Sequence, residues 1–294
     1  MTQIQTCDVS AAREQSSLRA RFDPVSFSLR ALVWLAALTV VVVFMWLVGY
    51  IVIKGLPYLS PRLFEWEYST ENVSMLPAIV ITVLMVVLAL LFAAPVGMGA
   101  AIYLVEYARK GSRLVSLVRL TTESLAGIPS IVYGLFGFLL FVVACGMGFS
   151  ILGGALTLAV MVLPLIMRTT EEALKSVPDS WREGSFALGA GRLRTIFRVV
   201  LPAAVPGILS GVILSIGRIV GESAALLYTA GTVAAMPESL LSSGRTLSVH
   251  MYALLSEGLY VNEAHATALV LLIVVLLINF ASSAVAALLV RERS

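Results

Sequence analysis

The chain alternates between long apolar runs and short polar segments. A membrane-spanning helix needs about 20 apolar residues, each rising 1.5 Å along the helix axis. An open sheet cannot satisfy its backbone hydrogen bonds in lipid, so every such run should be a helix. The pattern therefore predicts an all-α integral membrane protein with six transmembrane helices, two of them interrupted: Leu29–Ile53, Leu76–Leu104, Leu125–Ala144, Ile151–Met167, Ala203–Thr229 and Ala264–Val290.

The composition supports this class. The chain is 59% hydrophobic and 13% charged, whereas soluble domains are about 25% charged. The formal net charge of +3 is not a nucleic-acid signal, because the basic residues lie in segments between the apolar runs. The first apolar run is longer than the roughly 7–15-residue core of a signal peptide, so we expect an uncleaved span.

Lysine and arginine positions predict the orientation. With the N-terminus inside, 16 of the 20 Lys and Arg residues lie in inner segments, and only Lys54, Arg62 and Arg245 lie outside. The remaining one, Arg218, lies within a span. Inner loops of membrane proteins carry the excess of positive charge. Both termini are therefore predicted to be cytoplasmic, including an N-terminal tail over residues 1–28.

A long polar segment, residues 171–202, is predicted on the inner side. Ser180 and Glu183 have the spacing of a capping box, which predicts a short helix beginning there. Gly189 suits the position just beyond a helix, where φ is positive. The residues alone leave open whether this segment is a solvated loop or a docking surface.

Two spans contain unusual residues. Pro129 removes a backbone donor, so the third span should kink or break there, either for packing or to turn freed N–H groups towards a cavity. In the fifth span, glycines four apart favour close approach of a neighbouring helix; these are Gly207, Gly211, Gly217 and Gly221.

Arg218 and Glu222 are four residues apart, so on a continuous helix they share one side. A charge in the membrane costs at least about 2.5 kcal/mol on insertion scales, so the pair should face protein or a water-filled path. The alternative is an internal ion pair that only neutralises itself.

The polar segment resembles the EAA loop of ABC-importer permeases. The resemblance rests on the spacing from Glu183 to Gly189 and on to Leu201-Pro202. It implies that these four residues couple the chain to a cytoplasmic ATPase. The chain departs from the family pattern by small or near-isosteric changes at three positions: Gly184, Ser185 and Val199.

Two further strings resemble the A-type permease subunit of phosphate-specific ABC importers. One is Gly127-Ile-Pro-Ser130 with Tyr133-Gly134, and the other is Gly221-Glu-Ser-Ala-Ala-Leu-Leu227, where Ser223 and Ala225 replace the family's Thr and Pro. The resemblance implies a phosphate translocation path that includes Arg218, Glu222, Ser223, Pro129, Ser130 and Tyr133.

The resemblance also implies an organisation and a set of partners. We expect a first transmembrane helix over 29–53, a type I ABC importer permease domain over 72–284 that includes the coupling loop 171–202, and the end of the last helix with the C-terminus over 285–294. The implied partners are a homologous C-type permease subunit, two cytoplasmic ATPase subunits and an extracytoplasmic phosphate-binding protein. The implied location is the bacterial inner membrane.

No catalytic constellation is visible. None of the three lysines follows a glycine, so the chain holds no phosphate-binding P-loop, and any ATP must bind the partner subunit. We expect no cofactor and no metal; His250 and His265 have no partner Cys and are expected to be loop residues. The alternatives are a permease for another oxyanion, such as molybdate or sulfate, and an ion-coupled secondary transporter or channel, although no internal repeat favours the latter.

Overall fold

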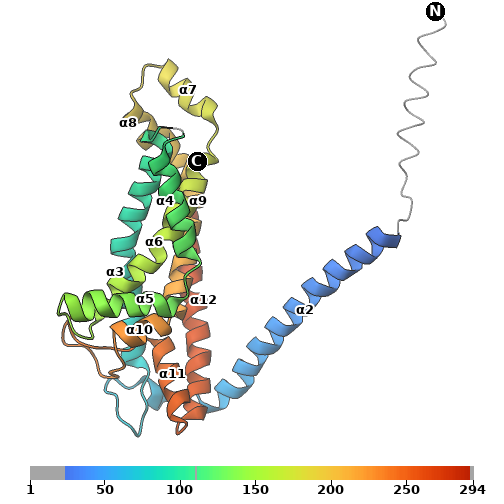
Figure 1. Ribbon diagram of the computed structural model, residues 1–294. Coiled ribbons are helices and arrows are strands. Elements are labelled where there is room, and N and C mark those ends of the chain that lie inside the picture. Colours follow the sequence, from blue (N-terminus) through green and yellow to red (C-terminus); the bar gives the residue numbers. More distant parts are fainter. Residues whose placement is uncertain (1–23, 110, 292–294) are drawn as a thin grey trace, which may run out of the picture. The chain divides into compact units, whose positions relative to one another are not determined.

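The computed structural model describes residues 24–109 and 111–291, and all regular secondary structure in this part is helical (Figure 1). The chain divides into two units, residues 1–53 and 54–294. The described part of the first unit lies in helix α2 (Pro24–Gly55). None of the most apolar stretch of this helix is buried, which suits a helix whose solvent is lipid or another subunit.

The second unit holds the remaining helices. Two 3₁₀ turns come first, η1 (Leu56–Tyr58) and η2 (Pro61–Phe64). The α-helices that follow are α3 (Leu76–Ile102), α4 (Arg113–Ala126), α5 (Ser130–Gly137), α6 (Ile151–Lys175), α7 (Asp179–Ala187), α8 (Arg192–Thr195), α9 (Leu201–Gly221), α10 (Ala224–Thr229), α11 (Leu247–Glu257) and α12 (Val261–Arg291). Three π-helical turns join or extend them: η3 (Tyr103–Tyr107), η4 (Phe138–Ala144) and η5 (Ile196–Val200).

Among the described residues, five helices are long and apolar enough to cross a membrane, and the count rises to six if the bent pair α4 and α5–η4 is one span. The predicted number of six is reached only in this way. Three predicted boundaries are wrong. The third span is two helices bent by 105°, the fourth continues as helix from Met167 to Lys175, and the fifth ends at Gly221, with α10 as a separate helix.

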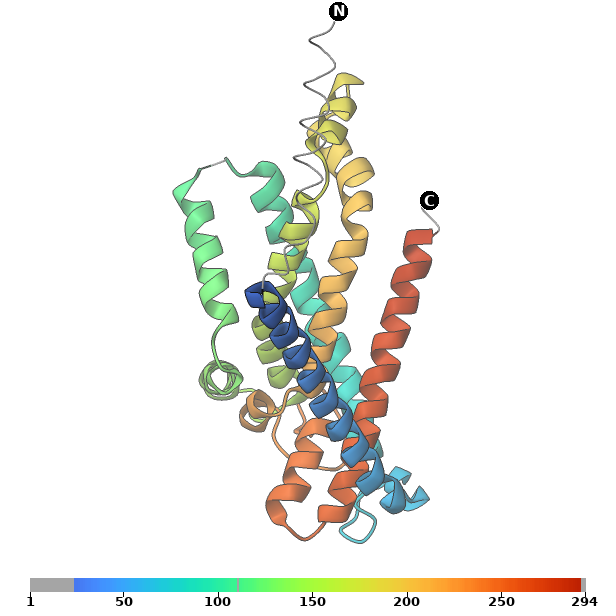
Figure 2. The same ribbon diagram turned by 90° about the vertical axis from the view of Figure 1, so that its right-hand side faces the viewer.

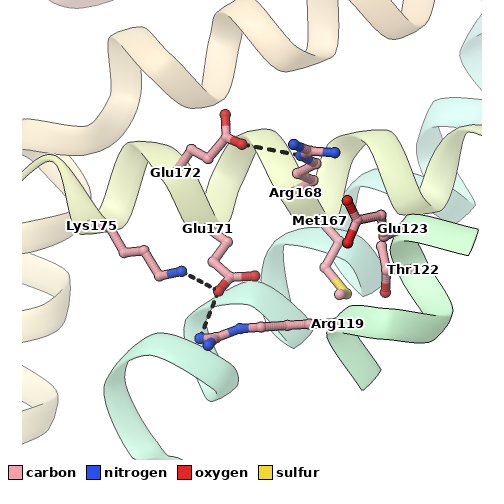
Figure 3. Close-up of a pocket in the computed structure, with 8 residues that line it drawn as sticks. All are labelled: Arg119, Thr122, Glu123, Met167, Arg168, Glu171, Glu172 and Lys175. Carbon is pink, nitrogen blue, oxygen red and sulfur yellow. Dashed lines mark hydrogen bonds and ion pairs between the residues drawn. The ribbon is translucent and has the colours of Figure 1, made fainter. Parts of the chain in front are cut away.

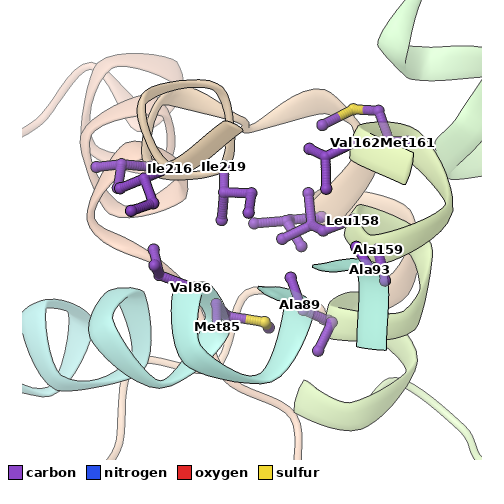
Figure 4. Packing of buried hydrophobic residues seen from close by; sticks show 14 of the residues in the cluster. Met85, Val86, Ala89, Ala93, Leu158, Ala159, Met161, Val162, Ile216 and Ile219 are labelled. Atoms are coloured by element: carbon purple, nitrogen blue, oxygen red, sulfur yellow. The ribbon is translucent and has the colours of Figure 1, made fainter. Parts of the chain in front are cut away.

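The core of the second unit lies where α6 packs against α3 and α9 (Figure 4). Met85 and Ala89 of α3 meet Leu158 and Val162 of α6, and Ile219 of α9 closes the cluster. Two-thirds of the most apolar stretch of α6 is buried, more than in any other spanning helix of the described residues. The central position of α6 explains its many small residues, because close packing of helices in lipid depends on them.

The glycines of α9 fulfil the packing prediction only in part. A Cβ on Gly207 would lie 2.6 Å from Cβ of Ala173, and one on Gly211 would overlap Thr169, so α9 meets α6 at backbone distance there. Gly217 and Gly221 have nothing within 4 Å of an added Cβ. The second glycine pair therefore marks no helix contact among the described residues, and its packing against a neighbouring helix stays a prediction.

The two ends of the second unit differ. Figures 1 and 2 show α7 and α8 at one end and α11 at the other, with the C-terminal end of α12 pointing towards the α7 end. In both views α5 and α10 lie across the long helices. His250 belongs to α11 and is fully buried, and His265 belongs to α12, so the prediction of two loop histidines is wrong.

Candidate functional site

Helix α7 begins and ends differently from what the capping pattern predicts. It begins at Asp179 with Pro178 as its N-cap, and no side chain caps its first turn. The capping box of Ser180 and Glu183 is therefore wrong, since both residues lie inside the helix. The end is as predicted: Gly189 has φ +83°. The amides of Gly189 and Ala190 donate to the carbonyls of Phe186 (2.9 Å) and Ser185 (3.1 Å), which is a Schellman motif.

One face of α7 is turned to the protein and the rest is exposed. Arg182 and Ser185, three residues apart, are the partly buried side chains of this helix. Glu183, Trp181 and Phe186 are exposed, and Leu188, just beyond the helix, is 90% exposed. Large apolar side chains that face solvent at the tip of a charged helix indicate a surface that a partner covers.

Arg182 anchors α7 to the end of α3. Its Nη2 and Nε donate to Oε1 of Glu106 at 2.9 and 3.2 Å, and its guanidinium also donates to the carbonyls of Val177 (2.7 Å) and Leu174 (2.9 Å). The Arg182 side chain is 13% exposed and the Glu106 side chain 9%. Sequence reasoning missed this pair; the signal was a lone carboxylate at the end of an apolar run.

The hairpin of α7 and α8 has two smaller supports. The hydroxyls of Ser185 and Thr195 lie 2.8 Å apart, and the Arg192 guanidinium stacks over the Tyr107 ring at 5.3 Å. The chain then runs through the π-turn η5 into α9, where Leu201 and Pro202 are the first two residues. Proline is tolerated there, because the first helical turn has no intrahelical use for its missing N–H.

Charged side chains of α4 and α6 line a pocket of about 180 Å³ (Figure 3). Oε1 of Glu171 lies 2.7 Å from Nη2 of Arg119 and 2.6 Å from Nζ of Lys175. Glu172 pairs with Arg168 at 3.1 Å on the outer side of α6. Glu171 is therefore a buried carboxylate that receives one cation from its own helix and one from another.

The two strings that resemble phosphate permeases meet in space. They form α5 and α10, and a Cβ on Gly134 would lie 2.8 Å from Cα of Ala225, so the two helices cross at backbone distance. Pro129 is the N-cap of α5 and Ser130 its first residue. The Tyr133 hydroxyl donates to the carbonyl of Leu125 at 2.8 Å, across the break between α4 and α5. The predicted break at Pro129 is confirmed.

Arg218 and Glu222 do not form the predicted pair. Glu222 has already left the helix, with ψ 128°, so the two side chains do not share a helix face, and no ion pair of the described residues joins them. The Glu222 carboxylate accepts a hydrogen bond from the backbone amide of Ala225 at 3.1 Å. The backbone carbonyl of Glu222 accepts one from the Ser248 hydroxyl at 2.6 Å. Ser223 is the N-cap residue of α10. Glu222 therefore fixes the break between α9 and α10.

Arg218 instead lines a groove of about 490 Å³ between α6, α9 and α12. The lining is otherwise mostly apolar, apart from Asn279 of α12. A cation in such surroundings is costly unless an anion or a partner lies against it.

At the opposite end, α11 carries a buried aromatic and basic cluster. The Arg245 guanidinium lies 4.8 Å from the centre of the Tyr68 ring, and the His250 ring packs edge-on against the same tyrosine. Burial, and then the charge of Arg245, lower the pKa of His250 to about 3, against a smaller opposing effect of the Val73 backbone. His250 is therefore neutral in the folded protein at ordinary pH.

Comparison with known proteins agrees with this architecture. The chain is 34% identical to the probable ABC transporter permease protein YqgI of Bacillus subtilis, over 84% of this chain and 90% of that protein. It is 41% identical to the phosphate transport system permease protein PstA of Yersinia pestis, over 63% of each chain, slightly less than two-thirds of that relative. A bacterial alginate ABC transporter solved with its periplasmic protein superposes with a TM-score of 0.66 at 18% identity, over 88% of this chain and 93% of that one.

A second solved structure, the MetNI methionine ABC transporter in an inward-facing conformation, superposes with a TM-score of 0.56 at 21% identity, over 73% of this chain and 94% of that one. Both likenesses show the fold of type I ABC importer permeases. Residues 93–294 match the family model described as the inner membrane component of binding-protein-dependent transport systems. The chain belongs to that family, as a transport subunit of the bacterial inner membrane whose ATP hydrolysis is carried out by a separate ATPase.

Proposed function

We propose that the chain is the permease subunit that translocates inorganic phosphate in an ABC importer. The observation that carries the proposal is the meeting of α5 and α10, because both strings that resemble phosphate permeases lie at this one junction of broken helices. Relatives named phosphate transport system permease protein are 38–45% identical to the chain, and their names support this substrate.

We place the phosphate path at this junction and along the Arg218 side of α9. Phosphate carries one to two negative charges, so a cation beside its route lowers the electrostatic barrier of the membrane. Pro129, Ser130 and Tyr133 would shape the α5 side of the path. Glu222 and Ser223 would hold the start of α10 in place, so that Glu222 acts on the backbone rather than on Arg218.

Helix α7 is the proposed coupling helix. Its exposed side chains Trp181, Phe186 and Leu188 would enter a cleft of the ATPase, with Glu183 on the same exposed surface. This orientation puts α7 on the cytoplasmic side, where the Lys and Arg pattern also predicts both chain termini. The exposed face of α5 and helix α2 would meet lipid or a homologous C-type permease subunit. The α11 end would face an extracytoplasmic phosphate-binding protein, and two ATPase subunits would complete the complex.

Uptake of labelled phosphate tests the substrate. The full complex is reconstituted in proteoliposomes, with the binding protein on one side of the membrane and ATP on the other. Labelled phosphate should cross from the side of the binding protein to the side of ATP, and only when both are present. Arg218→Gln should slow uptake at least about ten-fold, since one elementary charge near the path is lost. Gly99→Ala, on α3 and outside this groove, with nothing within 4 Å of an added Cβ, is the control. Uptake at the control rate in Arg218→Gln would contradict the path, and uptake of sulfate or molybdate in place of phosphate would contradict the substrate.

Capture of the ATPase tests the coupling role of α7. Gly189→Val forces a β-branched residue into a positive φ, which misplaces the end of the helix. We expect this variant to lose ATPase capture while its fold in the membrane survives. Gly184→Ala, in the middle of the same helix with open space around it, should capture the ATPase normally. Normal capture by both variants would mean that α7 is only a solvated hairpin.

A further inference from the structure

We propose that Glu171 is the joint through which movement of α7 reaches the broken helix pair α4–α5. The proposal rests on the coupling role proposed for α7. Glu171 lies one turn before the C-terminal end of α6, and only residues 176–178 separate that end from α7. A displacement of α7 by an ATPase therefore reaches this part of α6 through a short connection, beside the direct contact of Arg182 with Glu106.

The geometry makes Glu171 a link between two helices. Its side chain is 8% exposed, whereas those of Arg119 and Lys175 are 44% and 50% exposed. Lys175 belongs to the same helix as Glu171, so their ion pair does not connect two helices. Arg119 belongs to α4, so the 2.7 Å contact between its Nη2 and Oε1 of Glu171 ties α4 to α6. Both cations approach the same buried oxygen of Glu171 as ion pairs, so α4 and α6 are attracted to one point, which suits a joint.

The other contacts between α4 and α6 near this level are apolar and few. Helix α4 packs against α6 more extensively than against any other described helix. Its buried apolar side chain is Val115, one turn nearer its N-terminus, in the cluster that holds Leu174 and Val177, and the partly buried Val118 packs against the same cluster. On the other side of Arg119, the pocket of about 180 Å³ separates the two helices (Figure 3). This pocket is open to solvent, and the Arg119–Glu171 ion pair joins the two helices at its edge.

The link leads to the proposed phosphate path. Helix α4 continues through the break at Gly127–Pro129 into α5, with a bend of 105° between the two. Helix α5 crosses α10 at Gly134. A shift of α4 that follows Glu171 therefore moves the helix that crosses the start of α10. We infer that the Arg119–Glu171 pair transmits ATPase-driven motion to this junction.

The neighbouring ion pair provides a matched control. Glu172 and Arg168 lie on the same helix, 3.1 Å apart, with side chains 64% and 56% exposed. Because both residues belong to α6, this pair does not connect two helices, and both side chains are exposed to solvent. Glu171→Gln and Glu172→Gln therefore make the same chemical change on adjacent residues, and only the first one removes a link between helices.

The experiment uses the full complex in proteoliposomes and measures ATP hydrolysed per phosphate taken up. In Glu171→Gln and in Arg119→Gln we expect this ratio to rise by about five-fold or more, the lower end of the range for coupling between two sites. Combining the two substitutions should raise it no further, because both remove the same contact. Glu172→Gln should keep the wild-type ratio. Equal ratios in Glu171→Gln and Glu172→Gln, or a lower yield of Glu171→Gln complex with a normal ratio, would overturn the proposal.

A second measurement does not depend on the substrate. Spin labels at the exposed positions Ser116 of α4 and Ser180 of α7 report the distance between these helices in the complex with and without ATP. With the joint intact the two helices move together, so ATP should leave the distance unchanged. In Glu171→Gln the distance should change on ATP binding. If the wild-type complex takes up no phosphate, the proposed substrate is wrong. If the distance between the labels responds to ATP in the same way in wild type and in Glu171→Gln, the proposed joint is wrong.

Discussion

The anchoring of α7 can be tested by comparing the two carboxylates that bind the same arginine. Glu106 and Asp179 both accept from Arg182, but the Glu106 side chain is 9% exposed and that of Asp179 is 79% exposed. A buried carboxylate and an exposed one differ in their contribution, because water screens the exposed pair. We therefore expect Glu106→Gln to release α7 and Asp179→Asn to leave it docked.

The magnitude follows from the contacts. Glu106 accepts two hydrogen bonds from Arg182, at 2.9 and 3.2 Å. Hydrogen bonds to charged groups contribute about 1.5–3 kcal/mol, and Gln keeps an acceptor oxygen, so Glu106→Gln should cost about 2–3 kcal/mol of docking free energy. Since about 1.4 kcal/mol is a factor of ten, the opening equilibrium of the hairpin should rise roughly 30- to 150-fold. The exposed pair with Asp179 is worth about 0–1 kcal/mol, or at most about five-fold.

Hydrogen–deuterium exchange of residues 179–190 in the purified permease, without its ATPase, measures this equilibrium. Amides inside α7 should exchange faster in Glu106→Gln by the factor given above, while those of α6 and α9 keep their protection. Asp179→Asn should exchange as the wild type does. Unchanged exchange in Glu106→Gln, or equal acceleration in both variants, would refute the assignment of Glu106 as the anchor.

Two further predictions concern packing and pH. Gly134→Ala should lower the melting temperature, because its Cβ would lie 2.8 Å from Cα of Ala225 and overpacking costs about 1–3 kcal/mol; Gly99→Ala, with open space around it, should leave the melting temperature nearly unchanged. His250 has a folded pKa of about 3, below its value of 6.5 in the unfolded chain. The unfolded state therefore binds more protons between these values, so stability should fall by up to about 1.4 kcal/mol for each pH unit below 6.5 and be constant above it. Thermal unfolding of wild type and His250→Phe from pH 4 to 8 checks this, since the variant should lack that slope.

The amino-acid sequence by itself determined what depends on local backbone chemistry and on the solvent of each side chain. The apolar runs predicted the long helices, because lipid requires continuous internal hydrogen bonding. Pro129 marked a break because it has no amide proton. Gly189 marked the end of α7 because few other residues adopt a positive φ. These features need no knowledge of what lies nearby in space.

Tertiary structure decided the rest, and it overturned the predicted Arg218–Glu222 pair. That prediction assumed a continuous helix, but the Glu222 carboxylate and the Ser248 hydroxyl stabilise a break that the helical period cannot reveal. Glu106 stood out as a lone carboxylate at the end of an apolar run, but nothing in the sequence named Arg182, 76 residues away, as its partner. Which charges meet depends on the packing of α3, α4 and α6, because electrostatic partners are chosen by distance in space rather than by separation along the chain.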